Sequence, residues 1–268
     1  MATLTLLAKV YDKSQSGLIK DLLKSGLEGL DAELGIQGAT TRGWVQIDVS
    51  GEDEKTAVNY LTREFGQCPE QLKLVGKFQT IKGRIAGLDK NKAEVSVDIG
   101  VFSPSVVDAT IPLVQLQAQI ADGRKVSLRK LTELFGLCEN LPLTVKIFNI
   151  AEGENHIDAM LSEKQVLHYG NWISSLLDRL IIIGTTSHSI EAALKEAECS
   201  RDIVGIESLG LLEHCVVCKL GTDATGLIPK IGRHLREAAF SVFNPKRILE
   251  FLQDGSALPT SQPQDERS

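Results

Sequence analysis

The stretch Glu213-His-Cys-Val-Val-Cys-Lys-Leu-Gly-Thr-Asp-Ala-Thr-Gly-Leu-Ile-Pro-Lys-Ile-Gly-Arg233 contains the signals for a strand, a loop and a helix in succession. Residues 215–220 are apolar enough for a buried strand, and two glycines then bound a polar loop. Pro229 suits the first turn of a helix because its missing N–H is unpaired there anyway. Apolar residues recur after it at helical spacing. We therefore predict a strand over 215–220 and a helix from Pro229 to about residue 239.

The sequence on either side of this stretch completes a C-terminal α+β domain over residues 163–252. Its predicted order, after a first helix, approaches β-α-β-β-α-β. The expected elements are a helix after Ser162, a strand at 180–184, a helix at 189–198, strands at 203–208 and 215–220, the helix from Pro229, a strand near 240–243 and a short helix at 246–252. Residues 253–268 are rich in Ser, Pro, Gln and charge, so we predict a disordered tail.

Residues 1–76 predict an N-terminal domain with the same order of elements. Apolar and polar residues alternate over 3–11, as in a half-buried strand. A capped helix, strands at 32–36 and 44–49, a second helix after Ser50 and a strand at 72–75 follow. The order β-α-β-β-α-β is that of a ferredoxin-like α/β sandwich. Because such domains bind many unrelated partners, this fold leaves the function open.

Residues 77–162 form a third unit with a different pattern. Five short strands, with a helical stretch before the fourth, describe an OB-like β-barrel. The predicted strands are 78–88, 93–99, 109–113, 143–150 and 156–161, and the helix is capped by Ser127 and ends before Gly136. The fold class is therefore α+β and multidomain.

Three segments of the central unit resemble the S-one type of OB fold found in ribosomal and RNA-decay proteins. They are Lys82-Gly-Arg-Ile85, Val95-Ser-Val-Asp-Ile-Gly100 and Ile111-Pro-Leu-Val-Gln-Leu116. This resemblance covers about a third of the chain and implies an association with RNA.

The whole chain also resembles a family of uncharacterised archaeal proteins of unknown function. The resemblance is carried by Arg201-Asp-Ile-Val-Gly-Ile-Glu-Ser-Leu-Gly-Leu-Leu followed by residues 213–232 of the stretch quoted above. It implies an archaeal cytoplasm and brings no activity with it.

The composition argues for a soluble cytoplasmic protein without a membrane partner. No segment has the build of a signal peptide, and no apolar run reaches the ~18 residues that span a bilayer. The five cysteines are an odd, scattered set, which favours reduced thiols over a disulfide framework.

Charge is unevenly distributed along the chain. The net charge is −6, which argues against a polybasic binder. Residues 77–150 nevertheless hold ten Lys/Arg against seven Asp/Glu, and residues 219–247 hold six against two. Because phosphate contact depends on local potential, these two segments are the candidate nucleic-acid surfaces.

On the barrel, the candidate stacking and phosphate-binding residues are Phe78, Lys82, Arg84 and Phe102. The alternative is that both phenylalanines pack in the barrel and the basic residues are merely solvated. With aromatic residues at only 5%, any binding should depend on phosphate and shape.

In the C-terminal domain, a loop that feeds a helix N-terminus offers free N–H groups to an anion. The candidate residues there are Lys219, Thr222, Lys230, Arg233 and Arg236. The loop 221–226 has Walker A glycine spacing, but Leu227 and Ile228 stand where that motif needs Lys and Ser/Thr. The alternative is a helix start capped by Asp223 or Thr225.

The pair Cys215 and Cys218, beside His214, raises the question of a metal site. In a strand, positions i and i+3 point to opposite faces, so the two sulfurs should diverge. Structural zinc needs four ligands, and there is no second cysteine pair. We expect core cysteines, with no metal, no cofactor and no catalytic residue.

These observations favour a non-catalytic, RNA-associated protein that binds phosphate through the barrel and the basic C-terminal loop. The first alternative is a protein-interaction or assembly module of the translation or RNA-processing machinery. The second is an enzyme acting on an anionic small molecule at the 221–232 loop.

Overall fold

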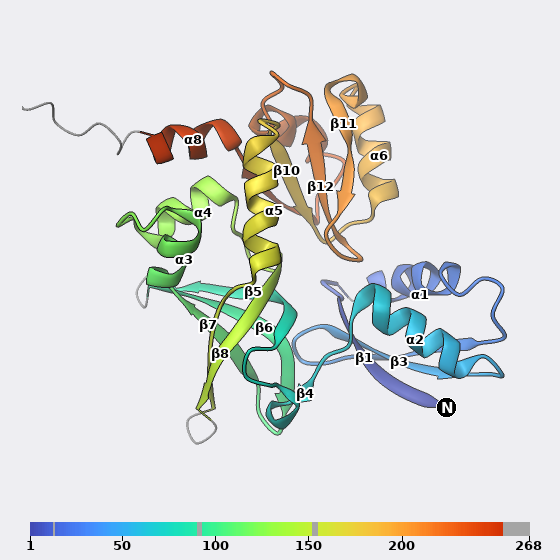
Figure 1. The fold of residues 1–268 in the computed structure, drawn as a ribbon. Coiled ribbons are helices and arrows are strands. Elements are labelled where there is room, and N and C mark those ends of the chain that lie inside the picture. Colours follow the sequence, from blue (N-terminus) through green and yellow to red (C-terminus); the bar gives the residue numbers. More distant parts are fainter. Residues whose placement is uncertain (13, 90–92, 152–154, 254–268) are drawn as a thin grey trace, which may run out of the picture.

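The computed structural model describes residues 1–12, 14–89, 93–151 and 155–253. Figure 1 shows an N-terminal α/β unit beside a β-barrel, and a C-terminal sheet above them. The predicted disordered tail lies outside the described residues, apart from Gln253, which ends the last helix. The α+β, multidomain class is confirmed.

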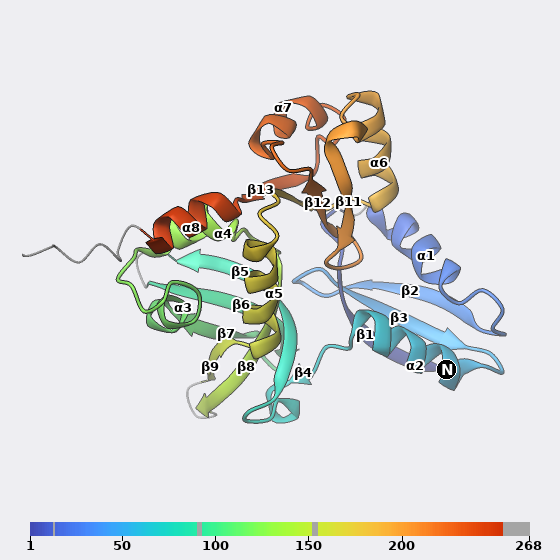
Figure 2. The same ribbon diagram turned by 45° about the horizontal axis from the view of Figure 1, so that its top comes forward.

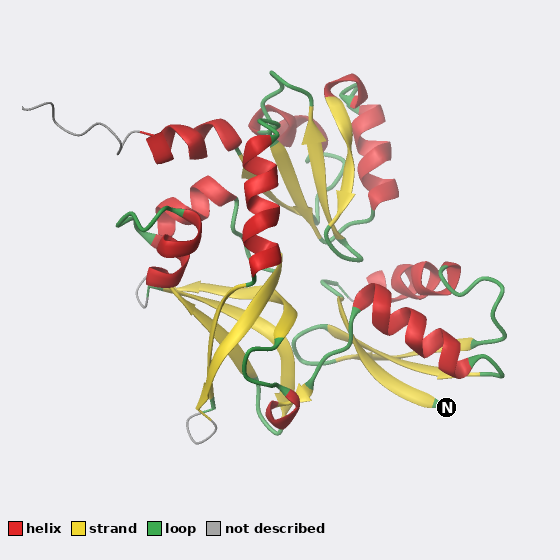
Figure 3. Cartoon of the chain, in the orientation of Figure 1, coloured by secondary structure: helices red, strands yellow, loops and turns green. Residues whose placement is uncertain are grey.

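The N-terminal unit is a three-stranded sheet with two helices on one side (Figure 3). Ile19 and Leu23 of the first helix and Leu61 of the second are buried in one core with the sheet. The strand order is β1-β3-β2, so β3 lies between β1 and β2, as in a split β-α-β unit. The elements are β1 (Ala2–Lys9), α1 (Gln15–Ser25), β2 (Glu33–Ala39), β3 (Trp44–Ser50) and α2 (Glu54–Phe65).

The predicted strand over 72–75 is wrong. Leu72–Leu74 is a 3-10 helix, and the two-residue strand before it, β4 (Glu70–Gln71), pairs with the barrel. Val75 is buried in the barrel core, with Leu72 packed against it, so these apolar residues serve the barrel rather than the first sheet. The N-terminal sheet keeps only an isolated bridge between Leu6 and Gln67 where a fourth strand would extend it.

The central unit is a closed barrel of five strands, as expected. The strands follow one another in the order β6-β5-β8-β9-β7, and β7 pairs again with β6. Only β7 and β9 are parallel among these neighbours. The elements are β5 (Thr80–Asp89), β6 (Glu94–Ser103), β7 (Val107–Pro112), α3 (Leu113–Ile120), α4 (Leu128–Phe135), β8 (Pro142–Ala151) and β9 (His156–Leu161).

The boundaries of α4 follow the signals in the sequence. The side chain of Ser127 accepts a hydrogen bond from the N–H of Lys130, which caps the first turn. Gly136 ends the helix with φ +63°, a left-handed conformation that favours glycine. The cap and stop predicted for this helix are confirmed.

The C-terminal unit has a complete four-stranded sheet of order β11-β12-β10-β13. Helix α5 (Glu163–Ser174) runs from the barrel towards this sheet (Figures 1 and 2). The remaining elements are β10 (Arg179–Ile183), α6 (Ser187–Glu196), β11 (Ile203–Ser208), β12 (Glu213–Cys218), α7 (Ile228–Ile231), β13 (Ala239–Phe243) and α8 (Pro245–Gln253).

The helix predicted from Pro229 to about residue 239 is wrong in its length. Only the single turn of α7 forms, and residues 232–238 continue as turns. Ile231 and Leu235 are buried beneath α6, so their helical spacing reflects burial rather than a continuous helix.

Both faces of the two inner strands, β10 and β12, are buried, which explains their uninterrupted apolar runs. Ile181 and Cys215 pack on the barrel side, whereas Ile182 and Cys218 pack on the α6 side. Cys215 and Cys218 therefore face opposite ways, as their spacing predicts.

Candidate nucleic-acid interface

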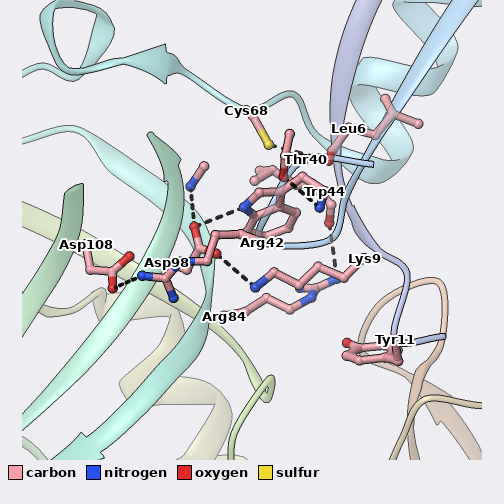
Figure 4. A network of polar contacts seen from close by, with 12 residues as sticks. Leu6, Lys9, Tyr11, Thr40, Arg42, Trp44, Cys68, Arg84, Asp98 and Asp108 are labelled. Carbon is pink, nitrogen blue, oxygen red and sulfur yellow. Dashed lines mark hydrogen bonds and ion pairs between the residues drawn. The ribbon is translucent and has the colours of Figure 1, made fainter. Parts of the chain in front are cut away.

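The three units meet at a buried polar network, which we call the polar interface and which Figure 4 shows in part. Its members are Lys9, Tyr11, Trp44, Arg84, Asp98 and Glu213. Asp98, on β6, accepts hydrogen bonds from Lys9 Nζ at 2.9 Å and from the Trp44 indole N–H at 3.0 Å. All three side chains are buried, so β1 and β3 are joined to the barrel through a paired carboxylate.

Arg84, on β5, joins the barrel to the C-terminal unit. Its Nη2 donates to Glu213 Oε2 at 2.9 Å and to the carbonyl oxygen of Leu7 at 3.1 Å. The Tyr11 hydroxyl donates to the same carboxylate. Burial and the nearby Glu213 charge raise the pKa of Tyr11 well above its usual value, so the hydroxyl keeps its proton. Arg84 is only 4% exposed, which corrects its predicted role as an open phosphate contact.

The N-terminal unit covers the second and third barrel strands, the face that OB folds usually present to nucleic acid. Asp98 of β6 lies beneath Trp44, and Asp108 of β7 accepts from Arg42 Nη2 at 3.0 Å. Half-buried Phe102 packs against the cluster of Leu7, Trp44 and Cys68. This acidic barrel face therefore binds a domain of the same chain, and base stacking by Phe102 stays a prediction.

Gly100 allows this close docking. Its φ is +81°, and a Cβ at that position would lie 2.6 Å from the Sγ of Cys68. The glycine that ends the Val95–Gly100 pattern is thus required by a contact between units as well as by the backbone.

A second face of the barrel remains open. On the ladder between β5 and β8, two pairs of opposite residues point outward: Thr80 with Lys146, and Lys82 with Thr144. Phe148 follows at the β-bulge that β8 forms opposite β9, and its side chain is half-buried. We call this the β5–β8 surface and define it by Lys77, Phe78, Lys82, Lys146 and Phe148.

Phe78 stands at one end of the β5–β8 surface. Its side chain is 66% exposed, and Lys77 Nζ lies 5.3 Å from the ring centroid. Its φ is +66°, which is rare for a bulky residue and costs about 1–3 kcal/mol. The Phe78 N–H is held by the Ile147 carbonyl at 2.7 Å. An exposed ring held in a strained conformation fits the predicted stacking role.

Helix α5 extends this surface. Lys146 Nζ pairs with Glu163 Oε1 at 2.9 Å, and the Thr144 N–H donates to Gln165 Oε1 at 3.0 Å. These contacts bring exposed Lys164, in the first turn of α5, next to the outward side chains of β8. The sequence could have indicated Lys146 and Phe148 as surface residues, because they alternate with buried residues along β8. Nothing in the sequence places Lys164 near them, because that proximity depends on how α5 packs on the barrel.

The β5–β8 surface leads into a cleft of about 480 Å³, lined by residues from all three units. Lys82 and Lys164 line it and are exposed, and half-buried His168 packs 4.4 Å from Trp172, measured between ring centroids. Burial lowers the pKa of His168, so its ring is neutral at pH 7. The Nε of Arg84 is buried in the same lining without a hydrogen-bond partner among the described residues.

The basic residues of the C-terminal unit are only partly brought together. Exposed Arg233 and Arg236 line a cavity of about 440 Å³ between α1 and the start of α6. Lys219 and Thr222 lie in the loop after β12, and Lys230 lies exposed on α7.

Carboxylates of the chain itself hold the loop over 221–227. Asp223 Oδ1 accepts from the Thr225 N–H at 2.9 Å, and Asp178 Oδ2 accepts from the Ala224 N–H at 3.4 Å. With α7 only one turn long, the extended helix dipole on which the anion prediction depended does not form. The bond from Thr225 to Asp223 is a local turn within the loop, and neither the 3-10 turn at Thr225–Leu227 nor α7 has a side-chain cap. The predicted alternative, a helix start capped by Asp223 or Thr225, is therefore not formed either.

Four of the five thiols, those of Cys68, Cys138, Cys215 and Cys218, keep their protons. Burial raises the pKa of Cys138 to about 11 and that of Cys218 to about 12, and it raises the pKa of Cys68 and Cys215 further. A protonated thiol is a poor nucleophile and a poor metal ligand. In the described part of the chain, no three His, Cys, Asp or Glu side chains gather as a metal site would require.

Three models of one protein family together match most of the chain. Models for the N-terminal, central and C-terminal domains of DUF2110 match residues 3–71, 76–173 and 177–243. The chain belongs to the DUF2110 family. This confirms the resemblance to a family of unknown function. No curated protein matches the DUF2110 chain. In its described residues, no helix is long and apolar enough to cross a membrane.

Solved structures similar to the DUF2110 chain are distant. The a/eIF2alpha–aDim2p–rRNA complex from Pyrococcus horikoshii OT3 contains a chain 11% identical, with a TM-score of 0.25, covering 48% of this chain and 70% of that one. The alpha subunit of aIF2 from Pyrococcus abyssi is 10% identical, with a TM-score of 0.25 and coverage of 63% and 96%. A protein from Thermus thermophilus, ttk003000868, is 13% identical, with a TM-score of 0.16 and coverage of 94% and 42%.

Proposed function

We propose that this DUF2110 protein is a non-catalytic RNA-binding protein that holds the phosphate backbone on the β5–β8 surface and Lys164. The observation that carries the proposal is the gathering of lysines and the exposed ring of Phe78 on one open face. Among the described residues, only Lys146 of these lysines has a carboxylate partner. Lys77, Lys82 and Lys164 remain available to phosphate.

Electrostatics support this face rather than the usual OB face. Each phosphate that a lysine neutralises releases counterions, so affinity arises from local positive charge even on an acidic protein. The usual OB face presents Asp98 and Asp108, both already paired with N-terminal basic residues. On the β5–β8 surface, Phe78 supplies a ring on which a base can stack without sequence preference.

The test is fluorescence anisotropy of a labelled single-stranded RNA 12-mer against the full chain, titrated across salt. We expect binding that weakens several-fold between about 50 and 200 mM salt. Lys82→Glu/Lys164→Glu should lower the affinity at least about tenfold, because it replaces two attractions with two repulsions.

Lys230→Glu/Arg236→Glu is the matched control, because it reverses two equally exposed charges on the C-terminal unit. It should change the affinity far less. Equal losses in the two double variants would place the RNA elsewhere. An absence of binding at about 50 mM salt would overturn the proposal.

A further inference from the structure

The cleft beyond Lys82 has the size and the walls of a pocket rather than of a groove for a duplex. Its volume of about 480 Å³ lies within the range of about 300–1,000 Å³ typical of small-ligand sites. It is lined by Phe65 of α2, Leu143 of β8, His168 of α5 and Leu209 before β12. A ligand in it would touch all three units at once.

His168 offers a flat ring to this space. It is half-buried and packs on Trp172, which is itself 4% exposed, so its orientation is fixed by packing. Since burial lowers its pKa, the imidazole is neutral at pH 7 and presents a π-face rather than a charge. Unpaired bases of RNA stack on side chains of this kind.

Arg84 adds a buried hydrogen-bond donor. Its Nη2 is held by Glu213 and by the Leu7 carbonyl, whereas its Nε, in the same lining, has no partner among the described residues. Arg84 as a whole is 4% exposed, so it forms a mostly covered, positively charged part of the cleft wall. Base edges carry carbonyl oxygens and ring nitrogens, which positive charge attracts.

We infer that this cleft receives one unpaired nucleobase of the RNA strand whose phosphates lie on Lys82 and Lys164. The inference rests on the proposed RNA binding and specifies its substrate class as single-stranded RNA. The base lies against His168 and towards Arg84, with its phosphates at the two exposed lysines. A duplex reaches the lysines as well, but its paired bases enter the cleft only by flipping out of the stack, which is unfavourable.

The experiment compares a single-stranded RNA 12-mer with a blunt duplex of the same length, using the full chain. The wild-type protein should bind the single strand more tightly than the duplex. His168→Ala should lower the affinity for the single strand at least about fivefold, the loss of one stacked base, and leave duplex binding unchanged. His168→Phe retains a ring and should keep most of the preference. Thermal melts of both variants check that the chain remains folded.

The outcomes separate this inference from the proposed function. If neither RNA binds the wild-type protein, RNA binding itself is wrong. If both bind and Lys82→Glu/Lys164→Glu weakens both, RNA binding stands. Equal affinity for single strand and duplex in the wild-type protein, or no effect of His168→Ala on a folded chain, would then overturn the base pocket alone.

Discussion

The N-terminal and C-terminal units share one order of elements but complete it differently. The C-terminal sheet is closed by β13, which pairs with β10 along its whole length. The N-terminal sheet has only the Leu6–Gln67 bridge at the equivalent edge, and the chain then leaves it as β4 to pair with β6. The C-terminal unit in turn reduces its second helix to the single turn of α7.

The two units also attach to the barrel by different physical means. The C-terminal sheet joins it through an apolar interface of four aromatic rings. Phe135, Tyr169 and Trp172 each lie 5.0–6.0 Å from Phe243, and Tyr169 lies 5.6 Å from Phe135 and 6.0 Å from Trp172, measured between ring centroids. The N-terminal unit joins it through the polar interface, whose Arg84–Glu213 pair also links the barrel to β12 of the C-terminal unit. Apolar contacts tolerate small changes of shape, whereas a buried ion pair is strongly destabilised when one partner is lost. The domains therefore depend on tolerant apolar packing between the barrel and the C-terminal sheet, and on strict pairing of charges where all three units meet.

The largest expected effect breaks the polar interface. Arg84→Met leaves Glu213, which is fully buried, without its cation, and should lower the free energy of unfolding by about 3–5 kcal/mol. Urea denaturation of the purified chain measures this change.

The matched variant is Arg84→Met/Glu213→Leu/Tyr11→Phe. It removes the charges of Arg84 and Glu213 together with the Tyr11 hydroxyl that donates to Glu213. It should regain most of the lost stability, because apolar residues of similar volume replace a buried pair at little cost. If the triple variant is as unstable as Arg84→Met, the ion pair itself contributes the stability, and the unpaired Glu213 carboxylate is not the cause of the loss.

A smaller effect is expected at the apolar interface. Ile181→Val removes one methyl group from a fully buried side chain on the barrel face of β10 and should cost about 0.5–1.5 kcal/mol. The same urea titration compares it directly with Arg84→Met. If Ile181→Val lowered the free energy of unfolding as much as Arg84→Met, the apolar interface would not be more tolerant of substitution than the polar interface.

The smallest expected effect is a decline of stability at low pH, caused by buried histidines outside the N-terminal unit. All five histidines follow residue 155, and none lies in the N-terminal unit. Burial lowers the pKa of His214, on β12, below that of an unfolded chain. As pH falls below about 6.5 the unfolded state takes up a proton before the folded state does, so stability declines until the folded pKa is passed.

Melting temperatures between about pH 7.5 and 5.5 measure this decline, and His214→Gln should reduce its slope. His168, whose pKa burial also lowers, should account for a remaining decline. His188→Gln is the control, because His188 lies exposed in the first turn of α6. An equal slope in wild type and His214→Gln would assign the pH dependence to other groups.

Several features of the fold follow from local patterns in the sequence. The cap at Ser127 and the stop at Gly136 bound α4 because backbone N–H groups and left-handed geometry select those residue types. The divergence of Cys215 and Cys218 follows from the two-residue period of a strand. The five barrel strands follow from alternation and turns.

Other expectations failed because distant contacts outweighed local ones. Ile231 and Leu235 have helical spacing, yet the chain buries them by turns beneath α6. Lys82 and Arg84 look equivalent on one strand face, but the N- and C-terminal units close over Arg84 and leave Lys82 exposed. No pattern within β5 distinguishes the two residues.

The sequence by itself determined the α+β class, the barrel, the β-α-β-β-α order shared by both ends and the family, because these depend on periodicity and residue type along the chain. Only the tertiary structure decided which basic residues are free. Docking of Trp44 and Lys9 on Asp98 covers one barrel face, and the packing of α5 brings Lys164 and His168 to another. Burial and ion pairing between distant segments are properties of the assembled units, and they leave exposed the surface on which we propose that RNA binds.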